Sequence, residues 1–360
     1  MQIIKYSEIN KLSILITTAI LILFCFTCKR ETNEIEIKKK LIKYHKIRQD
    51  WKMIQFVGTL FNDKANNFKH PTSLELFDNN SNLYFIDSSN HEVISCNISN
   101  NKLISRYGKL GTEISRSFYF PFKLRKIYDN LFIVPDGNMT MRIFNSKYDL
   151  IDYYHVYHII NDLVVSNKII YANCIYFDQK DHPLIEVFDL NGKKLSEFGD
   201  RIDRKIYLSF DSQAFLTLGE KEIIIGFEHY PIIRRYGLDG RLIKEIRIPV
   251  DILNNLVQYN SLEWFSKPAP NKIKLVNLIS GIRYHNNKIY VSLKLPRIEL
   301  IEMSLDGAIE NYYYADQPKN IYIVGDFILF GNSESEKIII IIYEDINKPI
   351  FCFYNLINRQ

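Results

Sequence analysis

The feature that most restricts the fold of this chain is a strand-and-turn unit that recurs along it. Asn191-Gly192, Asp239-Gly240 and Asp306-Gly307 each lie between two apolar runs. Asn-Gly and Asp-Gly in this setting indicate a β-hairpin with a type I′ turn, which needs a positive φ at both central residues. Another apolar strand precedes each turn, and it begins 25, 20 and 20 residues before the turn glycine.

Strands of this kind begin at six places in the sequence: Asn82, Asn130, Asn167, Glu220, Asn287 and Asp326. Their mean spacing is about 49 residues, and four short strands with their turns occupy about 40–50 residues, the size of one propeller blade. The spacing therefore predicts an all-β chain that forms a six-bladed β-propeller. A β-sandwich array is the alternative, but the near-constant distance from strand to turn and the 14% aromatic content favour repeated sheets packed on one another.

The two ends of the body predict how the ring closes. Residues 51–59 form an apolar strand without a partner in the first unit, and residues 338–343 and 350–356 continue the strand pattern nearly to the carboxyl end. An open ring would leave sheet edges unpaired, so we expect the amino-terminal strand to complete the last blade; packing elsewhere is the alternative. Five successive isoleucines at 338–342 predict a strand buried on both faces. The wide interval before Asn287 predicts an insertion at about 251–280 that lies over one face.

The amino-terminal segment is typical of an export signal. Lys5 and Lys11 precede an uncharged apolar run at 12–27, which is closer to the length of a secretory signal than to that of a membrane-spanning helix. The run ends in Phe26-Thr27-Cys28, which resembles a bacterial lipobox, although Cys25 stands where leucine is usual. The resemblance implies cleavage after residue 27 and a lipid on Cys28. An uncleaved anchor and simple secretion are the alternatives.

The charge of the chain is concentrated at this end. Of the 46 basic and 41 acidic residues, ten basic and five acidic ones lie in residues 1–50, so this segment carries the whole excess of five. Residues 28–50 are expected to form a charged, solvated tether; a tether that rests on anionic lipid is the alternative. The body, residues 51–360, is neutral and has no overall field to attract a polyanion, so we expect no nucleic-acid partner.

Two segments of the body are similar to NHL-type propeller repeats. Residues 82–98 match the pattern of a strand, Asp, two small residues, Asn-His and a second strand, and residues 104–122 match the connection to the next blade. As a whole the chain resembles the six-bladed, TolB-like propeller lipoproteins of the Bacteroidota. The resemblance implies an envelope location and gives a turn-capping role, through short polar side chains, to four residues: Asp87, Asn90, Asp136 and Asn138.

The sequence contains no established catalytic motif: no zincin, nucleophile-elbow, Walker or dinucleotide-binding pattern occurs. The eight histidines are His45, His70, His91, His155, His158, His182, His229 and His285. His155 and His158 would point to opposite faces of a strand and share a metal only in a helix or turn. Cys96, Cys174 and Cys352 are expected to be buried small hydrophobes, with one disulfide as the alternative.

Acidic and basic groups elsewhere are expected to be solvated. Asp178 with Asp181, and Glu228 beside His229, would lie at one rim of the ring, where a calcium ion or a sugar is the alternative interpretation. We therefore assign no catalytic, cofactor or metal site. We expect a monomeric propeller, anchored by lipid in the cell envelope, that binds a protein, peptide or glycan. The alternatives are a metal-dependent propeller hydrolase, lactonase or lyase with its site at the channel, and a structural subunit of an envelope complex.

Overall fold

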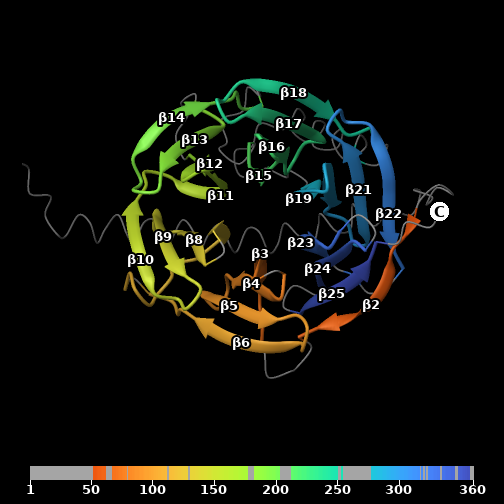
Figure 1. Cartoon of the computed structure of the whole chain (residues 1–360), viewed down its shortest axis with the longest axis horizontal. Helices are drawn as coiled ribbons and strands as arrows, with labels where there is room; N and C mark the ends of the chain where they lie inside the picture. Colours follow the sequence, from red (N-terminus) through yellow and green to blue (C-terminus); the bar gives the residue numbers. More distant parts are fainter. Residues whose placement is uncertain are drawn as a thin grey trace, which may run out of the picture.

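The computed structural model describes residues 52–356, apart from 62–66, 79, 112, 129, 177–181, 203–211, 250–252, 254–276, 317, 319–320, 322, 333–334 and 345–347. Over these residues the chain forms six sheets, arranged as blades around a central axis (Figure 1). Each sheet has four antiparallel strands, and one of them has a short fifth strand that pairs parallel at its edge. The predicted all-β, six-bladed propeller is confirmed.

Each blade takes four consecutive strands from the axis outward, except the last. Blade 1 contains β3 (Pro71–Phe77), β4 (Asn82–Asp87), β5 (Glu92–Asn97) and β6 (Lys102–Tyr107), and blade 2 contains β7 (Arg125–Tyr128), β8 (Leu131–Asp136), β9 (Thr140–Asn145) and β10 (Leu150–His155). Blade 3 contains β11 (Ile159–Ser166), β12 (Ile169–Ile175), β13 (Ile185–Asp189) and β14 (Lys194–Phe198), and blade 4 contains β15 (Ala214–Leu218), β16 (Glu222–Phe227), β17 (Ile232–Gly237) and β18 (Leu242–Arg247). Blade 5 contains β19 (Ile279–His285), β20 (Lys288–Leu293), β21 (Ile298–Ser304) and β22 (Ile309–Ala315), and blade 6 contains β23 (Ile323–Phe330), β24 (Lys337–Tyr343), β25 (Pro349–Asn355) and β2 (Gln55–Leu60).

The amino-terminal strand closes the ring as predicted. β2 is the outermost strand of blade 6 and pairs antiparallel with β25, with Gln55 opposite Asn355 (Figure 1). The two residues of β1 (Lys52–Met53) pair parallel with β22 at the edge of blade 5. One short segment therefore joins blades 5 and 6.

The three predicted Asn-Gly and Asp-Gly hairpins are present, but the type I′ geometry is wrong. Gly192 N–H donates to the Asp189 carbonyl at 3.1 Å, and of the two turn residues only Gly192 has a positive φ, of 78°. The pairing shifts register between Val187 and Phe188. This is a type I turn followed by a left-handed residue and a bulge, which also suits a right-twisted hairpin. The same left-handed position is filled in four other blades by Gly240, Gly307, Asn101 and Tyr148.

The predicted strand starts fall on two different strands of the blade. Five of them lie within two residues of the start of a second strand. The sixth, Asp326, lies inside β23, the innermost strand of blade 6, and the second strand there is β24. The prediction that a strand starts at Asp326 was wrong because a buried aspartate before an apolar run gives the same sequence pattern as a polar residue at the start of a strand.

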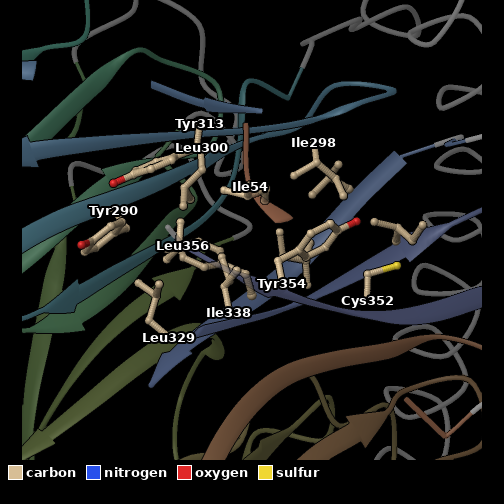
Figure 2. Close-up of a cluster of buried hydrophobic side chains, with 14 of the residues drawn as sticks. Ile54, Tyr290, Ile298, Leu300, Tyr313, Leu329, Ile338, Cys352, Tyr354 and Leu356 are labelled. Atoms are coloured by element: carbon tan, nitrogen blue, oxygen red, sulfur yellow. The ribbon is translucent and has the colours of Figure 1, made fainter. Parts of the chain in front are cut away.

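Apolar side chains pack between neighbouring blades in six clusters, one for each interface. β24 shows why the isoleucine run is needed. Ile338, Ile340 and Ile342 pack toward blade 5, whereas Ile339 and Ile341 pack toward blade 1, and all five are buried. Figure 2 shows the cluster between blades 5 and 6, in which Ile54, between β1 and β2, also takes part.

Several predicted segments lie outside the described residues. They are the signal at 1–27, the tether at 28–50 and nearly all of the insertion at 251–280. Leu253, a described residue near the start of that insertion, is buried among apolar side chains of blades 4 and 5. In the described part of the chain, no helix has the length and apolar character needed to cross a membrane.

Candidate binding site in the central channel

Each of the six innermost strands carries a polar side chain that takes part in the polar contacts or the cavity lining of the channel. In blade order they are Glu75, Arg125, Asp162, Thr217, Arg283 and Asp326. Asp162 and Asp326 each lie at a register shift in the first strand pair of their blade, and such bulges redirect a side chain relative to a regular strand. Two ion-pair systems result from this arrangement.

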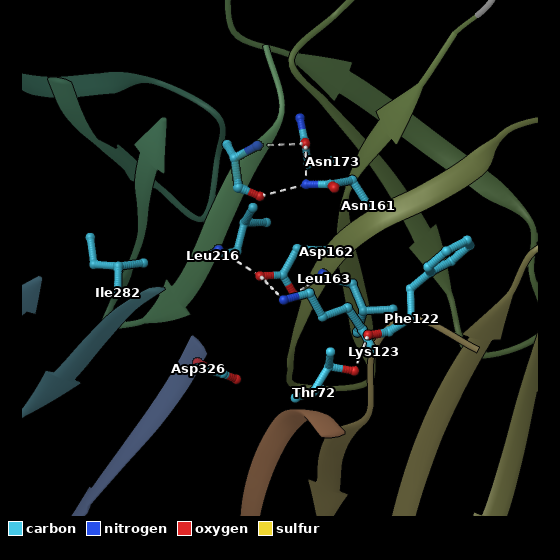
Figure 3. A network of polar contacts seen from close by, with 12 residues as sticks. Thr72, Phe122, Lys123, Asn161, Asp162, Leu163, Asn173, Leu216, Ile282 and Asp326 are labelled. Carbon is cyan, nitrogen blue, oxygen red and sulfur yellow. Dashed lines mark hydrogen bonds and ion pairs between the residues drawn. The ribbon is translucent and has the colours of Figure 1, made fainter. Parts of the chain in front are cut away.

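Asp162 is the centre of the first system (Figure 3). Arg125 Nη2 donates to both of its carboxylate oxygens, at 2.8 and 3.0 Å. The backbone N–H groups of Leu163 and Leu216 donate to it at 2.8 and 3.0 Å, and Lys123 Nζ lies 3.9 Å away. The Asp162 side chain has no exposed surface, so these contacts replace its hydration and connect blades 2, 3 and 4.

Asp326 is the centre of a second, similar system three blades away. Arg283 Nη2 donates to both carboxylate oxygens at 2.9 and 2.7 Å, and the N–H groups of Phe327 and Leu74 donate at 2.8 and 3.2 Å. Burial opposes ionisation of this group, but the charges of Arg283, Lys123 and Arg125 outweigh it and hold the pKa of Asp326 below its usual range. The aspartate is therefore a fixed anion that joins blades 5, 6 and 1.

Glu75 and Lys123 lie in the same polar region but are less well compensated. Arg125 Nη1 donates to Glu75 Oε1 at 3.1 Å, yet burial raises the pKa of Glu75 above its ordinary value. Burial likewise lowers the pKa of Lys123, whose ammonium group lies 4.8 Å from the centre of the Phe215 ring. In both cases the charged form is the one that the low-dielectric surroundings disfavour.

A cavity of about 260 Å³ opens beside these groups, toward the carboxyl-terminal ends of the innermost strands. Its polar lining comes from Glu75, Arg125, Lys126, Thr217, Arg283 and His285. Its apolar lining comes from Val164, Val165, Leu216, Leu218, Ile328 and Leu329. Apolar walls with a few fixed polar groups are typical of small-ligand sites.

A pair of asparagines, of which Asn173 is buried and Asn161 partly buried, supports the channel between blades 3 and 4 (Figure 3). Asn161 Nδ2 donates to Asn173 Oδ1 at 3.2 Å and to the Ala214 carbonyl at 2.8 Å. Ala214 N–H returns a bond to Asn173 Oδ1 at 3.1 Å. These bonds fix the start of β15 and hence the position of Leu216 beside Asp162.

A turn-capping role was predicted for Asp87, Asn90, Asp136 and Asn138. The contacts of the two aspartates fit this role. Asp87 accepts from Lys69 N–H and His70 N–H at 2.8 and 3.0 Å, and Asn90 Nδ2 donates to it at 2.8 Å. In the next blade, Asp136 accepts from Asn138 N–H at 3.1 Å. Asp136 also pairs with Arg142 at 2.8 Å, and burial raises the pKa of Asp136 to about 6.

His155 and His158 lie apart in the structure. His155, at the end of β10, lies with Nδ1 3.3 Å from Thr140 Oγ1. His158 instead packs on Tyr176 with ring centres 4.3 Å apart, and His182 stacks on the same tyrosine at 3.9 Å. The structure thus brings together His158 and His182, which the sequence did not predict.

The other described histidines have structural contacts. His70 Nδ1 lies 2.9 Å from Ser88 Oγ, and His91 Nδ1 accepts from Phe120 N–H at 3.2 Å. His229 is buried, and His285 lies 3.8 Å from Glu336. His45 lies outside the described residues.

The remaining predicted charged and sulfur-containing groups gather no ligand set among the described residues. Asp178 and Asp181 lie outside them, and Glu228 is bound by Asn277 and lies 3.6 Å from Lys294. Cys96, Cys174 and Cys352 are buried and unbridged, as expected. Over the part of the chain that the structure describes, no three His, Cys, Asp or Glu side chains gather as a metal site would require.

The ion-pair systems were missed at the sequence level, although a signal was present. Asp162 and Asp326 each interrupt an apolar run, and Arg125 and Arg283 lie on the innermost strands of the preceding blades. A lone charge in a buried strand requires a partner, and two acids with two bases at matching positions in the unit would have indicated the pairs. Which acid meets which base depends on blade order around the ring.

The sequence matches no protein-family model and no curated protein. Solved structures with a similar fold include a Bacteroides fragilis protein classed as exported, with a TM-score of 0.55 and 9% identity over 86% of this chain and 97% of that one. They also include a luciferin-regenerating enzyme (TM-score 0.53, 10% identity, 84% and 95% covered) and the calcium-binding protein regucalcin from Agrobacterium tumefaciens (TM-score 0.50, 9% identity, 84% and 96% covered). At these identities the likeness shows the fold alone.

Proposed function

We propose that this protein is a lipid-anchored, extracytoplasmic binding module whose propeller takes part of a peptide, protein or glycan ligand into the channel cavity. The observation that supports this function is that the channel aspartates are occupied by protein groups, whereas the cavity beside them is lined by basic and apolar side chains. Asp162 and Asp326 are fully engaged by arginines and backbone N–H groups, while the cavity beside them offers basic donors and apolar walls.

This arrangement favours binding over acid–base chemistry by the two aspartates. A general acid or base must reach the substrate and exchange a proton near the working pH. Asp162 has no exposed surface, and the pKa of Asp326 is held low by Arg283, Lys123 and Arg125 against burial. Asp162 and Asp326 instead hold the side chains of Arg125 and Arg283 in place.

The binding function is tested with the full-length protein in detergent, by thermal unfolding with panels of peptides and oligosaccharides. A ligand at 100 times its dissociation constant stabilises the folded state by about 2.7 kcal/mol. Leu218→Trp, which places a larger side chain in the cavity lining, is expected to reduce the stabilisation. A ligand effect unchanged in this variant would place binding elsewhere, and a stoichiometric divalent ion in the purified protein would support the enzyme alternative instead.

The proposed location at the membrane of the cell envelope rests on the amino-terminal sequence. Cys28→Ala should prevent lipidation and move the protein from the membrane fraction to the soluble envelope fraction. Membrane retention equal to that of the wild type would contradict lipidation at Cys28 and favour an uncleaved anchor.

A further inference from the structure

The channel contains the same arrangement of groups twice. In one copy Arg125 on β7 holds Asp162 on β11, which accepts from Leu216 N–H on β15. In the other copy Arg283 on β19 holds Asp326 on β23, which accepts from Leu74 N–H on β3. Each copy spans three successive blades, so a shift of three blades converts one into the other.

The two copies differ in the residue after the leucine. That residue is Glu75 in β3, and it accepts from Arg125 Nη1 at 3.1 Å. The equivalent residue in β15 is Thr217, whose Oγ1 accepts instead from Tyr284 N–H at 3.1 Å. Arg125 therefore has two carboxylate partners, whereas the described contacts of Arg283 include only one.

The difference leaves donor capacity on Arg283. All three nitrogens of Arg125 donate, to Leu163, Ser73, Glu75, Leu124 and Asp162. On Arg283, Nη2 donates to Asp326 and to the Leu74 carbonyl, and Nη1 donates to the Ile282 carbonyl. A guanidinium has five N–H donors, so Nε and one Nη1 hydrogen of Arg283 have no partner among the described residues. This side chain is 11% exposed and lines the cavity.

We propose that the cavity binds a ligand carboxylate at Arg283, in the place equivalent to that of the Glu75 carboxylate at Arg125. This inference rests on the proposed binding function and specifies its ligand. Thr217, which has a hydroxyl hydrogen to donate, borders the same place. Asp326 already holds Arg283 in one orientation, so little side-chain freedom is lost when the ligand carboxylate binds.

The remainder of the ligand is a small aliphatic group. The blades on either side of Arg283 supply Leu216 and Leu218 from β15 and Ile328 and Leu329 from β23 to the cavity lining. A volume of about 260 Å³ is ample for a branched chain of a few carbons. Two sources have this chemistry: a short free carboxylic acid, and the carboxyl end of a peptide whose last residue is aliphatic.

The charges around the cavity are consistent with an anionic ligand. Four basic side chains line or border the channel, and three carboxylates face them: Lys123, Arg125, Lys126 and Arg283 against Glu75, Asp162 and Asp326. When all seven groups carry their charges, one ligand carboxylate makes these numbers equal. A neutral amide of the same shape has no such effect.

The test is calorimetric titration of the full-length protein with 4-methylpentanoate, its amide and N-acetyl-Ala-Ala-Leu. The acid and the peptide should bind with one site per chain, and the amide about tenfold or more weakly, since hydrogen bonds to a charged group are the stronger ones. The source of the carboxylate is the peptide end if the peptide binds more tightly than the acid, and the free acid if the order is reversed.

Two variants of one position separate this site from any other. Thr217→Glu supplies the missing carboxylate from the protein itself and should abolish binding of the acid while raising thermal stability. Thr217→Val keeps the size of the side chain without a charge and should retain most of the affinity. Should Thr217→Glu fail to fold, Arg283→Lys keeps a cation for Asp326 but loses the planar donor pair, and it should weaken binding about tenfold.

The proposal is overturned if neither carboxylate binds to the wild type, or if Thr217→Glu binds the acid as well as the wild type does. An uncharged peptide or glycan that stabilises the wild type while both carboxylates fail would overturn this inference and leave the proposed binding function standing. Failure of every ligand panel together with both carboxylates would remove both.

Discussion

Arg125→Met is the most direct measure of what the channel ion pairs contribute to stability. The change removes the bidentate partner of Asp162 and the described cation contact of Glu75 at 3.1 Å. Removing one member of a buried pair costs about 3–5 kcal/mol because the other charge stays buried without compensation. Asp162 keeps two backbone N–H bonds and Lys123 at 3.9 Å, so we expect the lower end, about 3 kcal/mol.

The assay is thermal and urea unfolding at neutral pH. For a body of about 300 residues the unfolding entropy is about 0.6 kcal/mol/K, so a loss of about 3 kcal/mol lowers Tm by about 5 °C. Arg241→Met is the matched control: its side chain is 83% exposed and lies 3.9 Å from Asp239, and such pairs contribute about 0–1 kcal/mol.

A double variant separates the pair from its surroundings. Arg125→Met combined with Asp162→Leu removes both charges, and it should be more stable than Arg125→Met alone, because replacing a whole buried pair by apolar side chains is often neutral. A loss below about 1 kcal/mol in Arg125→Met, or a double variant less stable than the sum of the two single changes, would refute the reasoning.

Three further predictions concern turns, titration and packing. Gly240→Ala should lower stability by about 1–2 kcal/mol in urea unfolding, since Gly240 has a φ of 83° and an added Cβ would lie 2.8 Å from the Phe198 ring, whereas Gly58→Ala, with open space around it, should have little effect. Burial raises the pKa of Glu299 from its ordinary value of 4.5 to about 7, so the folded state binds more protons than the unfolded state and the free energy of unfolding falls as pH rises between these values. Glu299→Gln should flatten that part of the curve of stability against pH. An unchanged slope would contradict the assignment to Glu299. Ile54→Ala should cost about 2–4 kcal/mol by calorimetry because Ile54 is 3% exposed in the cluster between blades 5 and 6, and a loss under about 1 kcal/mol would show that this residue does not secure the closure.

The ring, its blade number and its closure could be predicted from the sequence because they depend on local patterns. Hairpin turns recur at nearly constant distance from apolar strands, and the isoleucine run at 338–342 needs apolar neighbours on both faces. Turn geometry failed at Asn191, because the pair Asn-Gly fits two hairpin types and the neighbouring residues decide between them.

The channel could not be predicted in the same way because its contacts join residues far apart in the chain. Leu74 and Asp326 meet only when the first and last blades are adjacent. The difference between Glu75 and Thr217 has meaning only after their strands are superposed by a shift of three blades. The histidines were candidate ligands by residue type alone. In the structure most of the described ones make ordinary hydrogen-bonding or packing contacts.

The pairing of Gln55 with Asn355 also has a consequence for biosynthesis. The first strand of the propeller to be made meets its partner only after nearly the whole chain exists, and closing a loop of this length costs about 5 kcal/mol of chain entropy beyond a constant. Blades 1 to 4 can form as each is completed, but β2 and the edge of β25 must wait for each other. The slowest folding step should therefore be ring closure, and a chain shortened by its last few residues should accumulate as an open, aggregation-prone intermediate.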